Sequence, residues 1–184
     1  MNAEQGPDDR DLLQAIASGD RGAMKTLYER HYAAVHKFIC SRSIEPSAAS
    51  DILHDTMLDV WRSADRFAGR ASVKTWMFSI AKNKIIDRYR KAKRTETSDK
   101  GLDLVDDSPG PFEALARSQD ITIVRDAIKE LSAEHRAAIH LAFVEELPYA
   151  EIAEIEGVAV GTIKTRIFHA KRRLARLISK QDPD

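Results

Sequence analysis

Hydrophobic residues recur at spacings of three and four along most of the chain, which is the period of amphipathic α-helices. No stretch alternates clearly between apolar and polar positions, as a half-buried β-strand would. The pattern therefore predicts an all-α protein. The expected helices cover residues 12–16, 24–39, 47–67, 73–94, 115–131 and 133–142, with two more within 145–178.

Residues that start or stop helices stand at the ends of these segments. Asp20, Ser72 and Ser132 are predicted N-caps, because their side chains can accept hydrogen bonds from the first free backbone N–H groups of a helix. Gly19 is expected to close the first helix, and Gly157 to supply the permissive backbone of a turn.

The segment 145–178 predicts two helices joined by a tight turn, a helix–turn–helix. Its first helix has an apolar side, and its second has one apolar stripe at spacings of four, three and four. These residues are Ile152, Ala153 and Ile155 in the first helix, Val158 and Val160 between the helices, and Ile163, Ile167, Ala170 and Leu174 in the second.

The outward side of the second helix is strongly basic, since residues 157–179 contain six basic side chains and no acidic one. Such a helix suits entry into a DNA groove and neutralisation of phosphates. A basic surface helix in a bundle is the alternative. The side chains expected to face outward are Lys164, Thr165, Arg166, Phe168, His169, Lys171, Arg172, Arg173 and Arg176.

Charge is segregated along the chain, although 29 basic residues balance 29 acidic ones overall. Residues 74–94 hold eight bases and one acid, whereas residues 95–120 hold seven acids and two bases. Two basic segments suggest two contacts with one polyanion. The stretch 95–111 is rich in Asp, Ser, Gly and Pro and predicts a flexible acidic linker. It separates two small helical domains, 1–94 and 112–184.

The third predicted helix carries Asp51, Asp55 and Asp59 at successive four-residue spacings, away from its apolar side. An acidic stripe is usually a solvated face, but repelling charges at this spacing also suit a basic partner surface. A metal site that uses Asp51, His54, Asp55 and His31 is disfavoured, because no tight ligand motif is present. No metal and no cofactor are expected.

The fourth predicted helix interleaves aromatic and basic side chains. This composition suits single-stranded nucleic acid, because unpaired bases can stack on aromatic rings while lysines contact the phosphates. A core helix with a basic solvent face is the alternative. Asn83 can present a donor and an acceptor to a base edge or simply satisfy a neighbouring backbone group. Trp76, Met77 and Ile80 are expected in the core, with Phe78, Ile85 and Tyr89 on roughly the opposite side.

The remaining composition points to a cytoplasmic protein. No run approaches the roughly 18 apolar residues of a membrane helix, and the polar, acidic N-terminus is unlike a secretory signal. Cys40 is the one cysteine, which excludes an internal disulfide or a cysteine-based zinc site and predicts a buried, inert thiol.

Two longer stretches resemble conserved regions 2 and 4 of bacterial RNA polymerase sigma factors. The first covers residues 47–94 and contains DVWR, ASVKTW and IAKNKIIDRYR; the second covers residues 131–178 and contains VGTIKTRIFHAKRRL. Their order, the acidic linker and the lack of further domains are similar to the small extracytoplasmic-function (ECF) group. The resemblance extends from about Asp11 to Leu177.

The resemblance implies three contact surfaces. The acidic third helix docks on the coiled coil of the β′ subunit of core RNA polymerase, through Asp51, Asp55, Asp59 and Trp61. The loop after it and the fourth helix capture a flipped base and melt the minus-ten element, through Phe67, Arg70, Lys74, Trp76, Lys82, Asn83 and Arg88. The recognition helix faces the minus-thirty-five element, through Thr162, Lys164, Thr165, Arg166, Phe168, His169, Lys171 and Arg172.

The resemblance further implies a promoter-specificity subunit without catalytic activity of its own, and an anti-sigma factor that occludes both DNA-binding surfaces. Three positions depart from the family pattern. Pro148 stands where a Ser or Thr often caps the first helix of the helix–turn–helix. Ala159 replaces a proline that is frequent in the turn, and His169 stands where arginine is common. The departure at His169 bears on which base is preferred there.

Two other classes of function compete with this reading. A one-component regulator would bind duplex DNA as a dimer and use residues 1–94 as a sensor, but a sensor does not need the basic, aromatic fourth helix. A nuclease or phosphotransferase would need a P-loop, a nucleophile motif or a metal cluster, and the sequence has none of these motifs.

Overall fold

The computed structural model describes residues 7–42, 44–95 and 119–181, and every regular element in these ranges is helical. The predicted all-α class is therefore confirmed. The described residues form two compact units, one built from α1 to α4 and the other from α5 to α8. The predicted linker lies outside the described residues, apart from Thr95.

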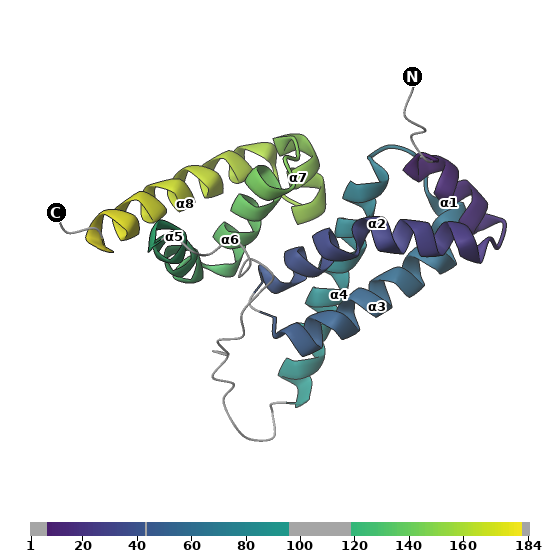
Figure 1. The fold of residues 1–184 in the computed structure, drawn as a ribbon, viewed down its shortest axis with the longest axis horizontal. Helices are drawn as coiled ribbons and strands as arrows, with labels where there is room; N and C mark the ends of the chain where they lie inside the picture. Colours follow the sequence, from purple (N-terminus) through teal and green to yellow (C-terminus); the bar gives the residue numbers. More distant parts are fainter. Residues whose placement is uncertain (1–6, 43, 96–118, 182–184) are drawn as a thin grey trace. The chain divides into compact units, whose positions relative to one another are not determined.

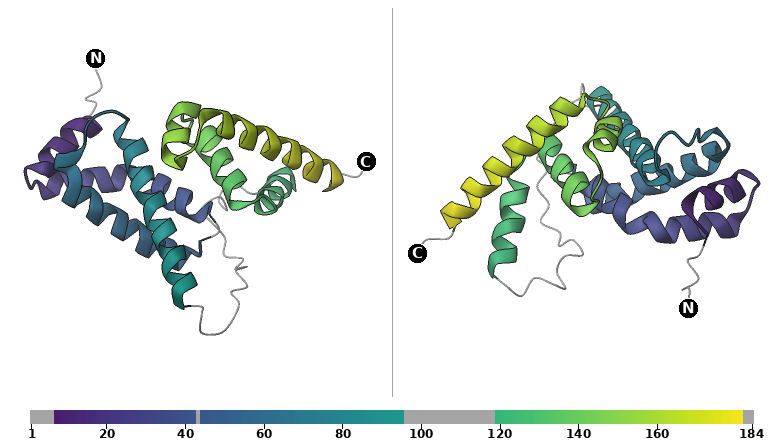
Figure 2. Two further views of the ribbon diagram at one scale, coloured as in Figure 1. Left: turned by 180° about the vertical axis from the view of Figure 1, so that it is seen from behind. Right: turned by 90° about the horizontal axis from the view of Figure 1, so that it is seen from above.

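The first unit consists of four helices and one short 3-10 turn. Its elements are α1 (Asp9–Ala17), α2 (Arg21–Cys40), α3 (Pro46–Ser63), η1 (Ala64–Arg66) and α4 (Val73–Thr95). Helices α2 and α3 lie side by side, and α4 crosses them (Figures 1 and 2).

Local capping sets the helix boundaries of this unit. Asp20 Oδ1 accepts hydrogen bonds from the backbone N–H groups of Gly22 at 2.7 Å and Ala23 at 3.1 Å, so the predicted cap of α2 is confirmed. Ser72 Oγ likewise accepts from Thr75 N at 3.1 Å at the start of α4. Gly19, with φ of 90°, follows the end of α1 in a conformation that glycine adopts without strain.

The core of the first unit is centred on an aromatic pair. The rings of Phe38 in α2 and Phe78 in α4 are fully buried, with centroids 5.1 Å apart. Phe78 and Ile85 were expected on the outer side of α4, and that prediction is wrong. The inward stripe of α4 is Val73, Met77, Ala81 and Ile85 at spacings of four, with Phe78 beside it, while Trp76 and Ile80 are half-buried.

The second unit arranges shorter helices along one long helix. Its elements are α5 (Gln119–Lys129), α6 (Ala133–Ile139), the π-helical turn η3 (His140–Val144), α7 (Tyr149–Glu156) and α8 (Val160–Gln181). Helices α5, α6 and α7 all pack against α8. The predicted cap at Ser132 is confirmed, because its hydroxyl accepts from His135 N at 3.4 Å.

The helix–turn–helix is formed by α7, the turn at Gly157 and α8. Gly157 adopts φ 63° and ψ 37°, the left-handed conformation, and ends α7. Ile152, Ile155, Ile163 and Ile167 are buried in the core, as their spacing predicts. Val160, the first residue of α8, is 39% exposed, so it does not fill the space between the helices as expected.

Within the part of the chain that the structure describes, no helix is long and apolar enough to cross a membrane.

Candidate nucleic-acid and polymerase interfaces

Helix α8 has one side that packs against the rest of its unit and another that is exposed. Ile163, Ile167 and Ala170 are buried against the rest of the unit. Most of the predicted reading residues lie on the exposed side, and Phe168 is 61% exposed. Its ring meets that of His169 edge-on, with centroids 5.4 Å apart. The exposed predicted residues are Thr162, Lys164, Thr165, Phe168, His169, Lys171 and Arg172.

Arg166 differs from its neighbours on α8. Its side chain is half-buried, and its Nη1 lies 3.4 Å from Oε2 of Glu156, whose side chain is 3% exposed. Arg166 was expected to face outward with the other cations. The ion pair holds its guanidinium against the end of α7, so Arg166 fixes α8 relative to α7 rather than projecting from it.

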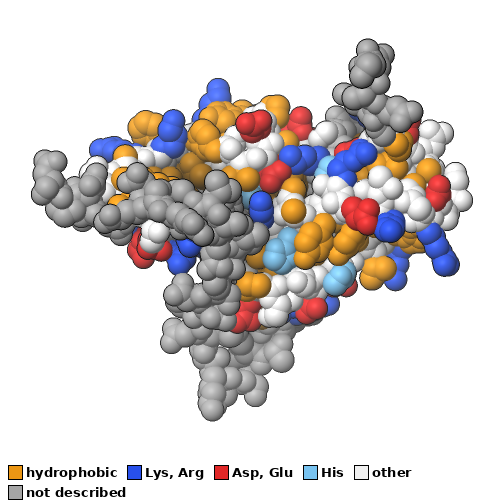
Figure 3. Space-filling model, viewed as in Figure 1, with side chains coloured by type: hydrophobic (Ala, Val, Ile, Leu, Met, Phe, Trp, Pro, Cys, Tyr) orange, Lys and Arg blue, Asp and Glu red, His pale blue; other side chains and the backbone are white. Residues whose placement is uncertain are grey.

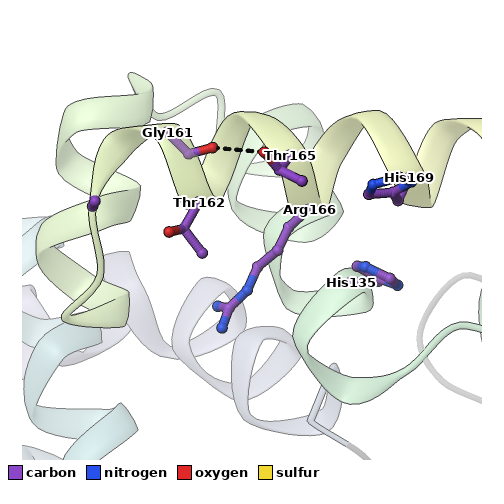
Figure 4. Close-up of a pocket in the computed structure, with 7 residues that line it drawn as sticks. His135, Gly161, Thr162, Thr165, Arg166 and His169 are labelled. Atoms are coloured by element: carbon purple, nitrogen blue, oxygen red, sulfur yellow. Dashed lines mark hydrogen bonds between the residues drawn. The ribbon is translucent and has the colours of Figure 1, made fainter.

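A groove runs along the first two turns of α8. It is lined by His135, Ala159, Gly161, Thr162, Thr165, Arg166 and His169. Figure 4 places His135 on α6 and shows its ring turned toward the same space as the ring of His169 on α8. His135 was missed by the sequence analysis, because it lies more than twenty residues before the other lining residues and no local motif connects it to them.

The far end of the predicted reading surface contacts η3. Lys171 Nζ lies 5.7 Å from the centroid of the Phe143 ring, a cation–π contact. Phe143 itself is 53% exposed. Arg172 and Arg173, the next two residues after Lys171, are exposed and can meet phosphates.

In the first unit, an aromatic pair marks the loop between η1 and α4. The rings of Phe67 and Trp76 lie 5.2 Å apart, and both side chains are half-buried. Gly69 has φ of 68°, and its carbonyl oxygen accepts a hydrogen bond from Arg10 Nη2 at 3.4 Å. Arg70 is exposed in the same loop. The structure thus brings Phe67 and Trp76 together at the start of α4, with Arg70 in the loop that connects them.

The basic residues of α4 lie in different environments. Lys74 Nζ is 5.9 Å from the centroid of the Phe78 ring, and Lys82 is half-buried. Asn83 and Arg88 are exposed further along the helix. The predicted minus-ten residues therefore extend from the loop over at least four turns of α4.

On α3, the predicted acidic stripe is only partly open. Asp51 and Asp55 are exposed, whereas Asp59 Oδ2 lies 2.6 Å from Lys84 Nζ of α4. Leu58, which is 50% exposed, follows Asp55 by three residues and lies on the same side of α3 as the two open aspartates. Leu58 was not among the predicted contact residues, although a large apolar residue on an acidic helix face is itself a signal of a contact surface.

An apolar pocket adjoins this stripe. It is lined by Arg21, Met24, His54, Met57, Leu58 and Trp61. Trp61, predicted to bind polymerase, is half-buried at this pocket. Acidic groups beside exposed apolar side chains can combine steering by charge with burial of apolar surface.

The residues considered for a metal site are not assembled. His31 Nε2 lies 2.7 Å from Asp9 Oδ2 in α1, and that carboxylate also pairs with Arg30. Among the residues that the structure describes, no group of three or more metal-ligating side chains is formed.

The surface seen in Figure 3 mixes apolar side chains with charges of both signs. Single exposed hydrophobic residues are normal and do not by themselves indicate a partner. Leu58 and Phe168 are informative because each stands among predicted contact residues.

Two family models match this chain, one in each of its two units. The family described as Sigma-70 region 2 matches residues 27–95, and Sigma-70, region 4 matches residues 121–174. The ECF RNA polymerase sigma factor SigM of Mycobacterium tuberculosis is 34% identical over 170 residues, which cover 92% of this chain and 84% of SigM. This chain belongs to the ECF sigma factors.

Further relatives of this sigma factor agree. The ECF RNA polymerase sigma factor RpoE of Cereibacter sphaeroides is 34% identical, with 91% of this chain and 93% of that protein covered. Among solved structures, the sigma factor RpoE of Bartonella quintana, crystallised with the anti-sigma factor NepR, aligns with a TM-score of 0.73 and 30% identity, over 84% of this chain and 96% of that one. The sigma-factor prediction is confirmed.

The matched regions contain every predicted contact residue of this sigma factor. The acidic stripe, the loop after η1 and α4 fall in the region 2 match, and the exposed side of α8 falls in the region 4 match. Helix α1, with Arg10, lies before the region 2 match.

Proposed function

We propose that this sigma factor directs core RNA polymerase to promoters by reading the minus-thirty-five element with α8 and capturing an unpaired base of the minus-ten element with α4 and the preceding loop. The observation that carries the proposal is the division of α8. One stripe is buried, while a continuous exposed side presents hydroxyl, imidazole, aromatic and basic groups. Such groups can donate to base edges and phosphates in a major groove.

The proposed role of α4 is to bind unpaired bases, whereas α8 reads duplex DNA. Unpaired bases can stack on aromatic rings such as the Phe67–Trp76 pair, and Arg70 is exposed in the loop between these two residues. Asn83 offers an amide that can pair with a base edge. Asn83 follows Trp76 by seven residues and so lies on the same side of α4, where one captured strand can meet both.

Polymerase docking is assigned to α3 under this proposal. Asp51 and Asp55 supply negative charge, and Leu58 and Trp61 supply apolar contact. The partner surface is the basic coiled coil of the β′ subunit. Polymerase provides the chemistry, so this chain needs no catalytic group and no cofactor, and it acts in the cytoplasm.

The proposal includes control by an anti-sigma factor. The solved relative from Bartonella quintana is bound to one, which supports a comparable partner for this chain. A protein that covers the exposed sides of α8 and α4 would block promoter binding without altering the fold of either unit.

Reconstitution with core enzyme tests the proposal. The chain should co-purify with core RNA polymerase in equal amounts and confer transcription from specific start sites on a genomic promoter library. A regulator that binds duplex DNA as a dimer would instead retard promoter fragments without core enzyme and would add no start sites. That outcome would refute the sigma-factor role.

A further inference from the structure

Gly161 has no evident structural reason to be glycine. It lies in the first turn of α8, where an alanine would favour the helix more than glycine does. The positive-φ glycines of the described residues are Gly19, Gly69 and Gly157, so Gly161 does not need the freedom that glycine gives.

Packing does not require glycine at this position either. A Cβ atom added to Gly161 would meet no heavy atom within 4 Å, outside its neighbours in the chain and the backbone of its own helix. At Gly22, by comparison, such an atom would lie 3.1 Å from Asp20 Oδ1. The space beside Gly161 is therefore open, and Gly161 is one of the residues that line the groove shown in Figure 4.

The groove around this space has walls from two helices. Thr162, Thr165 and His169 come from α8, and His135 comes from α6. The hydroxyl of Thr165 donates to the Gly161 carbonyl oxygen at 3.0 Å, so that carbonyl already has a partner within the helix. Thr162 and His135 supply a hydroxyl and a ring N–H, which are donors that commonly meet phosphate oxygens.

We propose that the sugar–phosphate backbone of the minus-thirty-five duplex lies against Gly161, in the groove that α8 forms with His135 of α6. The proposal rests on the assignment of α8 as the DNA-reading helix and adds Gly161 and His135 to its contact residues. The missing Cβ lets the backbone approach α8 closely. His135 then contacts that backbone from a second helix, which fixes the angle at which α8 lies on the duplex.

The cations near the groove suit this occupant, and the acidic neighbour Glu134 interacts with Arg166. Lys164 is exposed on the adjoining turn, and the guanidinium of Arg166 lies in the groove wall, held by Glu156. A DNA phosphate is negatively charged and accepts hydrogen bonds, so it can interact with both the cations and the neutral donors of this groove. Because every nucleotide carries the same phosphate, the contact sets position and affinity but carries no base preference.

Gly161→Ala provides the test in reconstituted holoenzyme. The variant chain should melt at the same or a higher temperature than wild type, while holoenzyme affinity for minus-thirty-five duplexes should fall about tenfold or more, as when one hydrogen bond to a charged group is lost. His135→Ala should weaken the same duplexes. Both variants should leave the order of preferred sequences in a randomised minus-thirty-five library unchanged.

Gly22→Ala is the matched control, since it also places a methyl group at the second residue of a helix but in the other unit. It should leave minus-thirty-five affinity unchanged. Wild-type affinity with Gly161→Ala would overturn the proposal, and so would a changed base preference in either groove variant, which would indicate contact with a base. If wild-type holoenzyme shows no preference for any minus-thirty-five sequence, the assignment of α8 fails instead.

Discussion

Lys84 of α4 holds Asp59 of α3 in an ion pair of 2.6 Å. The pair joins a helix assigned to polymerase docking with one assigned to promoter capture. It also divides the acidic stripe, because Asp59 has an internal partner while Asp51 and Asp55 remain exposed. The charge that α3 can offer to polymerase is therefore concentrated at its first two aspartates.

Reversing the exposed charges should abolish docking. The double variant Asp51→Lys with Asp55→Lys should lose co-purification with core polymerase and keep its helical content by circular dichroism, because both side chains face solvent. Glu29→Lys, which reverses another exposed acid of the same unit, should still co-purify. Unchanged core binding by the double variant would make the stripe a solvated face.

Asp59→Asn should behave differently. It removes a partly exposed ion pair, so the unfolding free energy should fall by less than about 1 kcal/mol, and the loss should shrink in high salt. Core binding should stay close to wild type. Urea denaturation at two salt concentrations and a pull-down measure both effects, and a complete loss of core binding would transfer the docking role to Asp59.

Asn83→Ala should separate promoter melting from promoter binding. Duplex binding should be largely retained, whereas open-complex formation should weaken, since the extrusion of a base costs a few kcal/mol that its pocket must offset. A pre-melted bubble template should partly restore transcription. Asp87→Asn, one turn further along α4, is the control. Equal defects on duplex and bubble templates would assign Asn83 a structural role.

Base readout and phosphate contact should be separable along α8. His169→Arg should change the preferred upstream bases, because arginine favours guanine while neutral histidine can donate and accept. Arg173→Ala should weaken all promoters alike and reduce the salt slope by roughly one. A randomised minus-thirty-five library at two salt concentrations measures both. The reverse pattern would mean that α8 is docked the other way round.

Glu134, in the first turn of α6, should contribute to stability in a pH-dependent way. Its own backbone N–H, with help from the Ser132 hydroxyl, lowers the pKa of this carboxyl below its ordinary value. Its contribution is therefore present above the unfolded-state pKa of about 4.3 and is lost as the pH falls through the lower folded value. The difference in unfolding free energy between wild type and Glu134→Gln should shrink in that acidic range; Glu130→Gln serves as the control. A difference independent of pH would contradict this account.

Features that depend on a few neighbouring residues could be predicted from sequence. The caps at Asp20, Ser72 and Ser132 and the turn at Gly157 follow from side-chain reach and backbone freedom within one turn. The burial of the α8 stripe follows from one clear helical period. These local rules were sufficient for the fold class and for the helix–turn–helix.

Features that depend on distant segments could not be predicted. Phe78 is buried because α2 supplies Phe38 across the core, and the mixed pattern of α4 fits two helical faces almost equally well. Arg166 is half-buried because Glu156 is placed beneath it by the turn. The approach of His135 to the α8 groove likewise arises only from packing between helices.

The two sides of α8 also differ in how freely they can evolve. Ile163, Ile167 and Ala170 are bound to the core, and Arg166 is bound to Glu156, so changes there alter the fold. Lys164, Phe168 and His169 touch little of the core and can be exchanged at small cost in stability. After gene duplication, a second copy could acquire a separate set of promoters by substitutions on this exposed side alone, while keeping the same polymerase.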